Sequence, residues 1–513
     1  MRMQAMAEQD KYRKNEIAYI FYGLLIVLAI LLLPHVMRML DGNFTLIGER
    51  SHINLRLSEM LGSGYSYRID DSLVHGGRIF HANLYNVMSA ALFKLIGVYS
   101  SVLLPVLLGL ASAYLLYSIL KRFGFDAVQR YAICLVLALS PSFLYAFSLS
   151  NQDSMAIALT LFGILLFSEN KKDYTFYAAV CFALASFFSL FNIILIALFM
   201  LFYSAGKAAD RPAGNEPAGK NNMMNKIFFC SVPLFVIAIS KPIVLYNSLV
   251  SQSFHIQPMA AGAVSITQAF AGILNNFITD LGAVTGFGIF YLILAVTGFV
   301  STWNEKSRYY PLYLGTLFML FAVFYSGNEI NAYANFAFAV FAGLGILRIR
   351  DMGWQSVFIK DATLLIIVCG LLFSTVSYIN ILGDMEPRQN EMGAFAFMRE
   401  SQPDGIVLSS PSKAMMFEYF GQKPVLFDNL AGTIRNYDEK ADDANALYMS
   451  GNIEEARSIL KKYDIAYIAI DSGMRNGLVW DEPDKGMLAL LKNSKTFKKV
   501  YDSSEIEIWK VNY

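Results

Sequence analysis

Long apolar runs alternate with short polar segments along the chain between residues 17 and 380. Several runs are about 18 or more residues long, which is enough for a helix to cross the hydrocarbon core of a bilayer. The pattern predicts about eleven transmembrane helices, over residues 17–38, 99–119, 130–148, 152–168, 174–188, 189–204, 227–247, 283–301, 309–326, 331–347 and 362–380. The stretch 174–204 is too long for one straight helix, and we expect its turn near Ser189 and Asn192.

The pattern changes after residue 383. Short β-type runs at 405–409, 424–428, 465–471, 497–501 and 505–511 alternate with helical stretches. One helix is expected to begin at Asn452, with Glu455 reaching back to the cap. Residues 384–513 are therefore predicted to form an α/β soluble domain. Residues 1–383 are predicted to form a polytopic all-α membrane domain with a large first loop, 39–98, in which 83–97 would form a helix lying at the membrane surface.

Beyond the first loop, the loops that carry lysine and arginine alternate with loops that carry almost none. The two residue types stand in the segments after the second, fourth, sixth, eighth and tenth predicted spans, at Lys121, Arg122 and Arg130; Lys171 and Lys172; Lys207, Arg211, Lys220 and Lys226; Lys306 and Arg308; and Arg348, Arg350 and Lys360. The loops at 149–151, 248–282 and 327–330 contain neither residue. Because cytoplasmic loops keep positive charge, we expect a multi-pass protein of the cell membrane. Its N-terminus would be cytoplasmic and its C-terminal domain extracytoplasmic.

Composition agrees with a membrane protein. Hydrophobic residues make up 56% of the chain and charged residues 16%, whereas soluble domains have roughly 25% charged residues. No basic tract with interleaved aromatic residues occurs, which excludes a nucleic-acid partner of the usual kind. Cys134, Cys181, Cys230 and Cys369 all lie within apolar runs, which favours buried or lipid-facing thiols over a disulfide framework or a metal site.

Polar side chains gather in the predicted outer loops. The segment 41–81 carries Glu49, Arg50, His52, Arg56, Arg68, Asp70, Asp71, His75, Arg78 and His81. A second turn, SLSNQDS, carries Asp153, and the long outer loop carries His255 and Gln268. Carboxylates from separate loops can converge on a hard divalent cation. The alternatives are that Glu49 is a solvated loop charge, that Asp153 caps a helix, and that Asp70 and Asp71 are turn residues.

Lys241 stands inside the seventh predicted span, beside Pro242. A cation at that depth either meets a phosphate or carboxylate or extends to the interface along its own alkyl chain. No Walker loop, G-x-S-x-G elbow or His-Glu-x-x-His motif is found. Familiar nucleotide, hydrolase and zinc-protease chemistry therefore has no support in the sequence.

Five segments carry a resemblance to a known family: IGERSHINLRLSEML (47–61), HANLYNVMSAALFKLIGV (81–98), SLSNQDSMAIAL (148–159), GIVLSSPSKAMMFEYFGQKPVLFDN (405–429) and EEARSILKKYDIAYIAID (454–471). Together these segments resemble the GT-C superfamily of membrane glycosyltransferases. Within it, the chain is most similar to the archaeal oligosaccharyltransferase catalytic subunit and its paralogues. The resemblance implies a donor in which a sugar is linked to a polyprenyl phosphate.

The resemblance also implies roles for individual residues. Glu49 and Asp153 would be catalytic and would hold a divalent cation, Mn²⁺ or Mg²⁺. Arg56 would match the arginine that closes the family's first-loop motif. Apart from the resemblance, we expect Arg56 and, from its place inside a span, Lys241 to contact the donor phosphate. The family's WWDYG acceptor motif would fall on residues 410–414, where this chain has SPSKA. An acidic residue of the family's long loop would fall on Gln268, which with His255 would lie on the acceptor side.

Three functions are open on this basis. The first is a membrane glycosyltransferase that moves a sugar or glycan from a polyprenyl-phosphate donor to an acceptor, a protein or a glycolipid, on the outer face. The second is a non-catalytic paralogue that binds lipid-linked glycans or scaffolds a glycosylation complex, which the changes at 410–414 and Gln268 favour. The third is a transporter, for which internal inverted repeats would be expected; no long-period repeat is evident.

Overall fold

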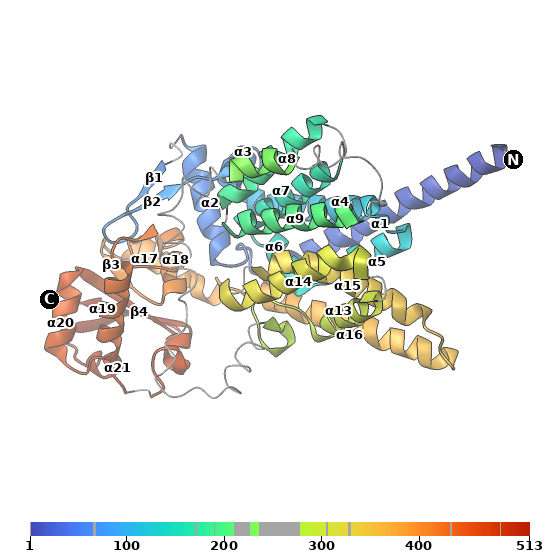
Figure 1. The fold of residues 1–513 in the computed structure, drawn as a ribbon. Coiled ribbons are helices and arrows are strands. Elements are labelled where there is room, and N and C mark those ends of the chain that lie inside the picture. Colours follow the sequence, from blue (N-terminus) through green and yellow to red (C-terminus); the bar gives the residue numbers. More distant parts are fainter. Residues whose placement is uncertain are drawn as a thin grey trace. The chain divides into compact units, whose positions relative to one another are not determined.

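A computed structural model describes residues 2–64, 68–169, 172–188, 190–209, 226–234, 277–303, 306–326, 330–430, 433–482 and 484–512. The chain divides into two compact units (Figure 1). The helical unit comprises Met1–Met37 and Val102–Gly383, and the sheet unit comprises Arg38–Ser101 and Asp384–Tyr513. The first loop thus groups with the C-terminal part of the chain, whereas the sequence pattern assigns it to the membrane domain.

Helices α1, α4–α9 and α13–α16 make up most of the helical unit. Their bounds are α1 Arg2–Leu40, α4 Ser100–Arg122, α5 Ala127–Ala138, α6 Pro141–Ser148, α7 Gln152–Ser168, α8 Lys172–Phe188, α9 Leu190–Ala209, α13 Ile289–Thr302, α14 Lys306–Ser326, α15 Asn331–Asp351 and α16 Val357–Gly383. Residues 226–234 are also helical. The predicted turn within 174–204 is confirmed as the break between α8 and α9, where the Asn192 side chain donates to the Ala185 carbonyl at 3.0 Å.

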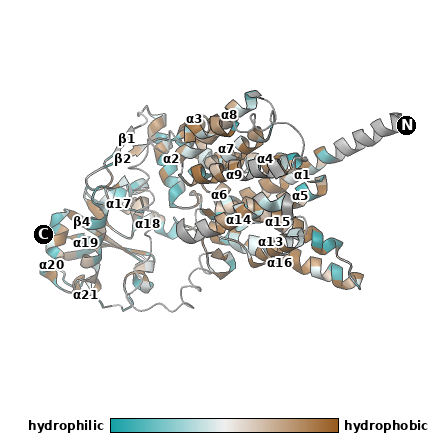
Figure 2. Ribbon diagram, in the orientation of Figure 1, coloured by the Kyte–Doolittle hydropathy of each residue, from teal (hydrophilic) through white to brown (hydrophobic). Residues whose placement is uncertain are grey.

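Four helical segments of the described residues are long and apolar enough to cross a membrane: Glu16–Leu40, Leu84–Arg122, Asn331–Asp351 and Val357–Gly383. In α16, one of these four segments, apolar residues recur along the helix (Figure 2). Helices α5 and α6 form a fifth candidate if they are one span, bent by 69°. The bend immediately precedes Pro141, because a proline cannot continue the hydrogen bonding of the preceding helix. The number of eleven spans stays a prediction.

Helix α15 is the most buried of these candidate spans, with 78% of its most apolar window inside the protein. Glycines allow α13 and α15 to approach closely. A Cβ atom on Gly298 would lie 1.8 Å from the Phe341 carbonyl oxygen, and one on Gly345 would lie 2.1 Å from the Leu294 carbonyl oxygen. Small residues at a helix contact let two backbones pack together where lipid offers no hydrophobic driving force. Only glycine is accommodated at these two positions.

The sheet unit contains a four-stranded sheet of order β3-β4-β6-β5. The strands are β3 Ile406–Leu408, β4 Ile465–Asp471, β5 Phe497–Asp502 and β6 Ile506–Val511; β3 and β4 are parallel and the other pairs are antiparallel. These strands confirm four of the five predicted runs. The prediction of a strand at 424–428 was wrong, because only Val425 forms bridges there, to Val407 and Val74.

Helices and a hairpin complete the sheet unit. They are α2 Glu49–Gly62, β1 Arg68–Asp71, β2 Arg78–His81, α3 Leu84–Ile96, α17 Met392–Ser401, α18 Pro411–Tyr419, α19 Tyr437–Met449, α20 Ile453–Lys462 and α21 Met487–Leu490. Asn452 caps α20 as predicted, by accepting from the Glu454 amide at 3.0 Å. Glu455 instead accepts from the Ser450 hydroxyl at 2.8 Å. Val74, from the first loop, lies in the apolar core of this unit.

Candidate active site

Glu49 is the first residue of α2 and follows Gly48, whose φ of 75° suits glycine. Its Oε1 accepts a hydrogen bond of 2.9 Å from the Asn429 side chain. Its Oε2 is buried and has no hydrogen-bond partner among the residues that the structure describes. Burial raises the pKa of Glu49 to about 7; Glu386 and Asp428 add to the rise, and Asn429 and Arg50 oppose it.

This environment fits a cation ligand. A buried polar atom that is left without a partner typically costs about 1–3 kcal/mol. A divalent cation would satisfy the second oxygen of Glu49 and would favour the ionised carboxylate over the protonated one. Magnesium and manganese ions prefer such carboxylate oxygens. The Glu49 carboxylate therefore has the chemistry that the predicted cation requires.

Asp153 is the second residue of α7. The helix is capped by Asn151, whose side-chain oxygen accepts from the Asp153 amide at 3.2 Å, so the reading of Asp153 as the cap was wrong. The Asn151 side-chain amide also donates to Asp153 Oδ2 at 3.0 Å. The turn before α7 is attached to α1, because His35 Nε2 donates to the Ser148 carbonyl at 2.9 Å. A carboxylate at this helix N-terminus is also favoured by the helix dipole.

Glu49 belongs to the sheet unit and Asp153 to the helical unit. Their shared cation stays a prediction. Within the described parts of the chain, no group of three or more His, Cys, Asp or Glu side chains could hold a metal ion. Lys241, His255 and Gln268 lie outside the described residues, so their predicted roles also stay predictions.

Arg56 belongs to a buried cluster of charged residues that the sequence does not reveal. We call it the charge cluster; its members are Arg56, Asp71, Arg78, Glu418 and Asp428. Arg56 contacts Asp71 Oδ1 at 2.5 Å and Glu418 Oε2 at 3.1 Å. Arg78 contacts Asp71 Oδ2 at 2.7 Å and also pairs with Glu418 and Asp428. A donor phosphate at Arg56 would therefore compete with two carboxylates already in place.

The charge cluster contains three carboxyl groups and two guanidinium groups. Burial raises the pKa of Glu418 well above its usual range, and Asp428 adds to the rise while Arg78 opposes it. Burial also acts to raise the pKa of Asp71, but Arg78 and Arg56 hold it below the usual value. A raised pKa favours the protonated form of Glu418, which reduces the negative charge that Arg56 and Arg78 must offset in this interior site.

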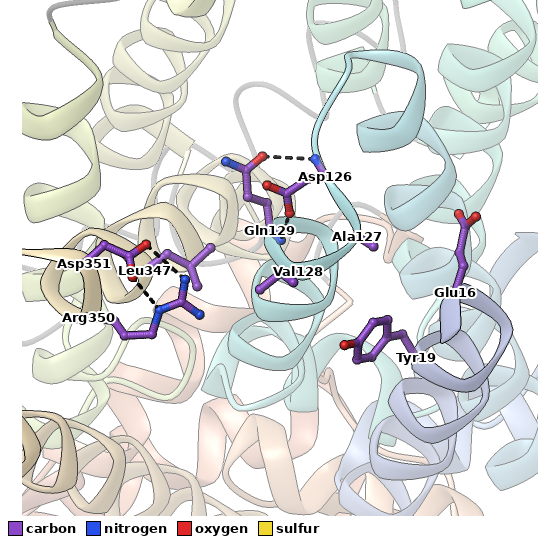
Figure 3. Close-up of a pocket in the computed structure, with 9 residues that line it drawn as sticks. All are labelled: Glu16, Tyr19, Asp126, Ala127, Val128, Gln129, Leu347, Arg350 and Asp351. Atoms are coloured by element: carbon purple, nitrogen blue, oxygen red, sulfur yellow. Dashed lines mark hydrogen bonds and ion pairs between the residues drawn. The ribbon is translucent and has the colours of Figure 1, made fainter. Parts of the chain in front are cut away.

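The helical unit contains a pocket of about 410 Å³ beside the middle of α1, the N-terminus of α5 and the C-terminus of α15 (Figure 3). It is lined by Glu16, Tyr19, Asp126, Ala127, Val128, Gln129, Leu347, Arg350 and Asp351. Glu16 and His35 are nineteen residues apart in α1, or roughly 28 Å at 1.5 Å per residue. Because His35 contacts the turn before Asp153, the pocket lies at the opposite end of the helices from Asp153.

No known protein-family model matches the chain, and no curated protein matches its sequence. Solved structures share its fold. The oligosaccharyltransferase of Archaeoglobus fulgidus in the apo form is 13% identical, with 96% of this chain and 74% of that chain covered and a TM-score of 0.62. The same enzyme, AglB, with an inhibitory peptide and a dolichol-phosphate gives the same values.

ArnT from Cupriavidus metallidurans bound to undecaprenyl phosphate is 12% identical, with 96% of this chain and 97% of that chain covered and a TM-score of 0.51. These structures confirm, at the level of the fold, the predicted resemblance to the GT-C superfamily. The same fold and the long apolar helices together support a membrane protein.

Proposed function

We propose that the chain is a membrane glycosyltransferase that moves a sugar or glycan from a polyprenyl-phosphate-linked donor to an acceptor on the outer face. The observation that carries the proposal is the buried, unpartnered Oε2 of Glu49. It stands at a position that the sequence resemblance already assigns to cation binding, in a chain that shares its fold with two glycosyl-transferring proteins.

In this reaction the acceptor hydroxyl or amide forms a bond to the anomeric carbon while the bond from that carbon to the phosphate oxygen breaks. The polyprenyl phosphate leaves with the bonding electron pair, and the acceptor releases its proton to water. Glu49 and Asp153 would hold a divalent cation. When bound, that cation neutralises charge that develops on the departing phosphate. Asn151 fixes one oxygen of Asp153, and Asn429 fixes one oxygen of Glu49. Each carboxylate would thus keep its orientation before the donor arrives.

Two solved structures of the same fold support a polyprenyl-phosphate-linked donor. One solved structure carries a dolichol-phosphate and another an undecaprenyl phosphate, and both ligands are polyprenyl phosphates. We assign Lys241 to the donor phosphate, and His255 and Gln268 to the acceptor side. Arg56 would contact a donor phosphate only by giving up its contacts with Asp71 and Glu418. The cell membrane would hold the chain with its N-terminus in the cytoplasm and residues 384–513 as an extracytoplasmic domain.

A second candidate function is non-catalytic binding of lipid-linked glycans, or scaffolding of a glycosylation complex. The observation that favours it concerns residues 410–414, where an acceptor motif would fall. Ser410 donates to Asp471 at 2.5 Å, and buried Lys413 lies 2.7 Å from Glu386 while also pairing with Glu391. These side chains thus make contacts within the sheet unit.

Transfer by the purified full-length protein in detergent tests the proposal. A pool of polyprenyl-phosphate-linked sugars would be supplied with Mn²⁺ or with EDTA. We expect metal-dependent transfer or hydrolysis in the wild type and its loss in Glu49→Gln and Asp153→Asn. The exposed Glu482 supplies the control substitution Glu482→Gln, which should keep full turnover. Full transfer by both Glu49→Gln and Asp153→Asn would refute the mechanism, and metal-independent binding without turnover would favour the non-catalytic function.

A further inference from the structure

Asn429 follows a short segment, residues 424–428, whose backbone is hydrogen-bonded to two other segments. The Val407 amide donates to the Pro424 carbonyl at 2.8 Å on one side. On the other side the Val425 amide donates to the Leu73 carbonyl at 2.9 Å, and the His75 amide donates to the Val425 carbonyl at 2.8 Å. The segment therefore links β3 to the first loop. The hydrogen bonds to Leu73 and His75 join residues that are more than three hundred positions apart in the sequence.

Asp428, immediately before Asn429, is fully buried. Its Oδ1 accepts from the Leu430 amide at 2.8 Å, and its Oδ2 pairs with Arg78 of the charge cluster. The residues on both sides of Asn429 are thus held by one carboxylate. This arrangement holds the backbone on both sides of the exposed Asn429.

The Glu49 end of the Asn429–Glu49 hydrogen bond also stands on backbone that is attached to a neighbouring segment. The Gly48 amide donates to the Glu386 carbonyl at 2.9 Å, and His52 Nδ1 donates to the Gly48 carbonyl at 3.0 Å. The start of α2, and with it the Glu49 backbone, is therefore attached to the segment that precedes α17. Both partners of the Asn429–Glu49 hydrogen bond stand on anchored backbone.

We propose that Asn429 is a positioning residue for Glu49, a role that rests on the proposed function. By donating to Oε1 at 2.9 Å, its side-chain amide limits rotation of the carboxylate and leaves Oε2 for the cation. An uncharged donor suits this task. A lysine at 429 would neutralise the carboxylate that the cation needs, whereas an amide orients it and keeps its charge.

Thermal unfolding of the full-length protein in detergent, titrated with MnCl₂ and without donor, tests this role. Loss of the amide in Asn429→Ala should raise the Mn²⁺ concentration for half-maximal stabilisation by about 10-fold, the usual effect of removing a group that orients a metal ligand. Asn429→Leu, which has nearly the same volume, should do the same. Asn429→Gln keeps the donor and should recover part of the affinity. Asn476→Ala, at another exposed asparagine of the sheet unit, should leave the midpoint unchanged.

The outcomes separate the two proposals. If Glu49→Gln abolishes stabilisation by Mn²⁺ while Asn429→Ala and Asn429→Leu keep the wild-type midpoint, the role of Asn429 is wrong and the proposed function stands. If Mn²⁺ stabilises the wild type and Glu49→Gln equally, or neither protein, cation binding at Glu49 is wrong and the role of Asn429 falls with it. An increase in the midpoint for Ala and Leu with partial recovery for Gln supports the proposal.

Discussion

The Arg78 guanidinium donates to the Glu418 carboxyl inside the sheet unit, although 340 residues separate them in the sequence. Arg78 is almost fully buried and also contacts Asp71 and Asp428. Its substitution by alanine would leave three carboxyl groups with Arg56 as their nearest cation. Removing one partner of a buried ion pair commonly costs about 3–5 kcal/mol. We expect Arg78→Ala to lower the free energy of unfolding by that amount, as measured by thermal unfolding in detergent.

The control for this substitution is Arg399→Ala, which removes an arginine whose pairing with Glu400 is exposed to solvent. Exposed pairs contribute about 0–1 kcal/mol. A destabilisation by Arg78→Ala as small as that of Arg399→Ala would show that the charge cluster does not hold the first loop in place.

Glu418 predicts a particular dependence of stability on pH. Its pKa is raised in the folded protein above the usual 4.5, so the folded state binds its proton more tightly than the unfolded state. The stability that this group contributes is complete below pH 4.5 and is lost as the pH rises toward the folded pKa. We expect Glu418→Gln, which stays neutral, to reduce this decline with rising pH. The measurement is the melting temperature between pH 4.5 and pH 8 for both proteins.

The groups that face Glu418 are Arg56, Arg78, Asp71 and Asp428. Arginine side chains do not deprotonate in proteins over this pH range, and the pKa of Asp71 is held low. A slope in Glu418→Gln identical to that of the wild type would mean that Glu418 is ionised in the folded protein at these pH values.

The contact between α13 and α15 predicts sharp sensitivity at Gly298. Because a Cβ atom there would lie 1.8 Å from the Phe341 carbonyl oxygen, the two helices would have to separate. We expect Gly298→Ala to destabilise the protein by about 1–3 kcal/mol, the usual cost of overpacking. Gly315→Ala in α14 is the matched control, because its Cβ would meet nothing within 4 Å. It should be neutral or stabilising by up to about 1 kcal/mol, since alanine favours a helix. Equal melting temperatures for the two variants would contradict this packing.

Helix α3 exposes apolar side chains. Leu95 is 79% exposed and Tyr99, just beyond the helix, is 68% exposed, whereas Tyr85 and Ser89 on another face are buried. An exposed apolar face that leads directly into the apolar helix α4 is suited to the membrane interface. We expect brominated lipid in nanodiscs to quench the fluorescence of the tryptophan that Leu95→Trp introduces. Ser458→Trp, at an exposed position of α20, is the comparison, and equal quenching at both positions would contradict a membrane contact of α3.

Elements that depend on neighbouring residues could be predicted from the sequence. Strand β4 matches the predicted run at 465–471, because its apolar residues are consecutive and buried on both faces. The start of α20 follows from the capping chemistry of Asn452. The strand expected at 424–428 failed because its apolar pattern is the same whether the segment forms a continuous ladder or, as here, bridges only at Val425.

The candidate site could be predicted only in part. The acidic residue Glu49 stood out by its place in the first loop, but its partner Asn429 did not, because a lone asparagine 380 residues away gives no local signal. The charge cluster was missed for the same reason. Its only trace in the sequence is the density of charged residues between 41 and 81, some of which find their partners near residues 418 and 428.

The division of the sheet unit into two distant segments bears on the order of synthesis. Arg78 and Val74 leave the ribosome long before Glu418, Val425 and Asp428. Until residues 418–428 are made, Arg78 lacks its partners Glu418 and Asp428. Over the same period Val74 has no apolar core to pack into. Residues 38–101 must therefore wait in an open form while 282 residues of the helical unit, Val102–Gly383, are synthesised. Formation of these contacts by the first loop thus requires that synthesis has passed residue 428.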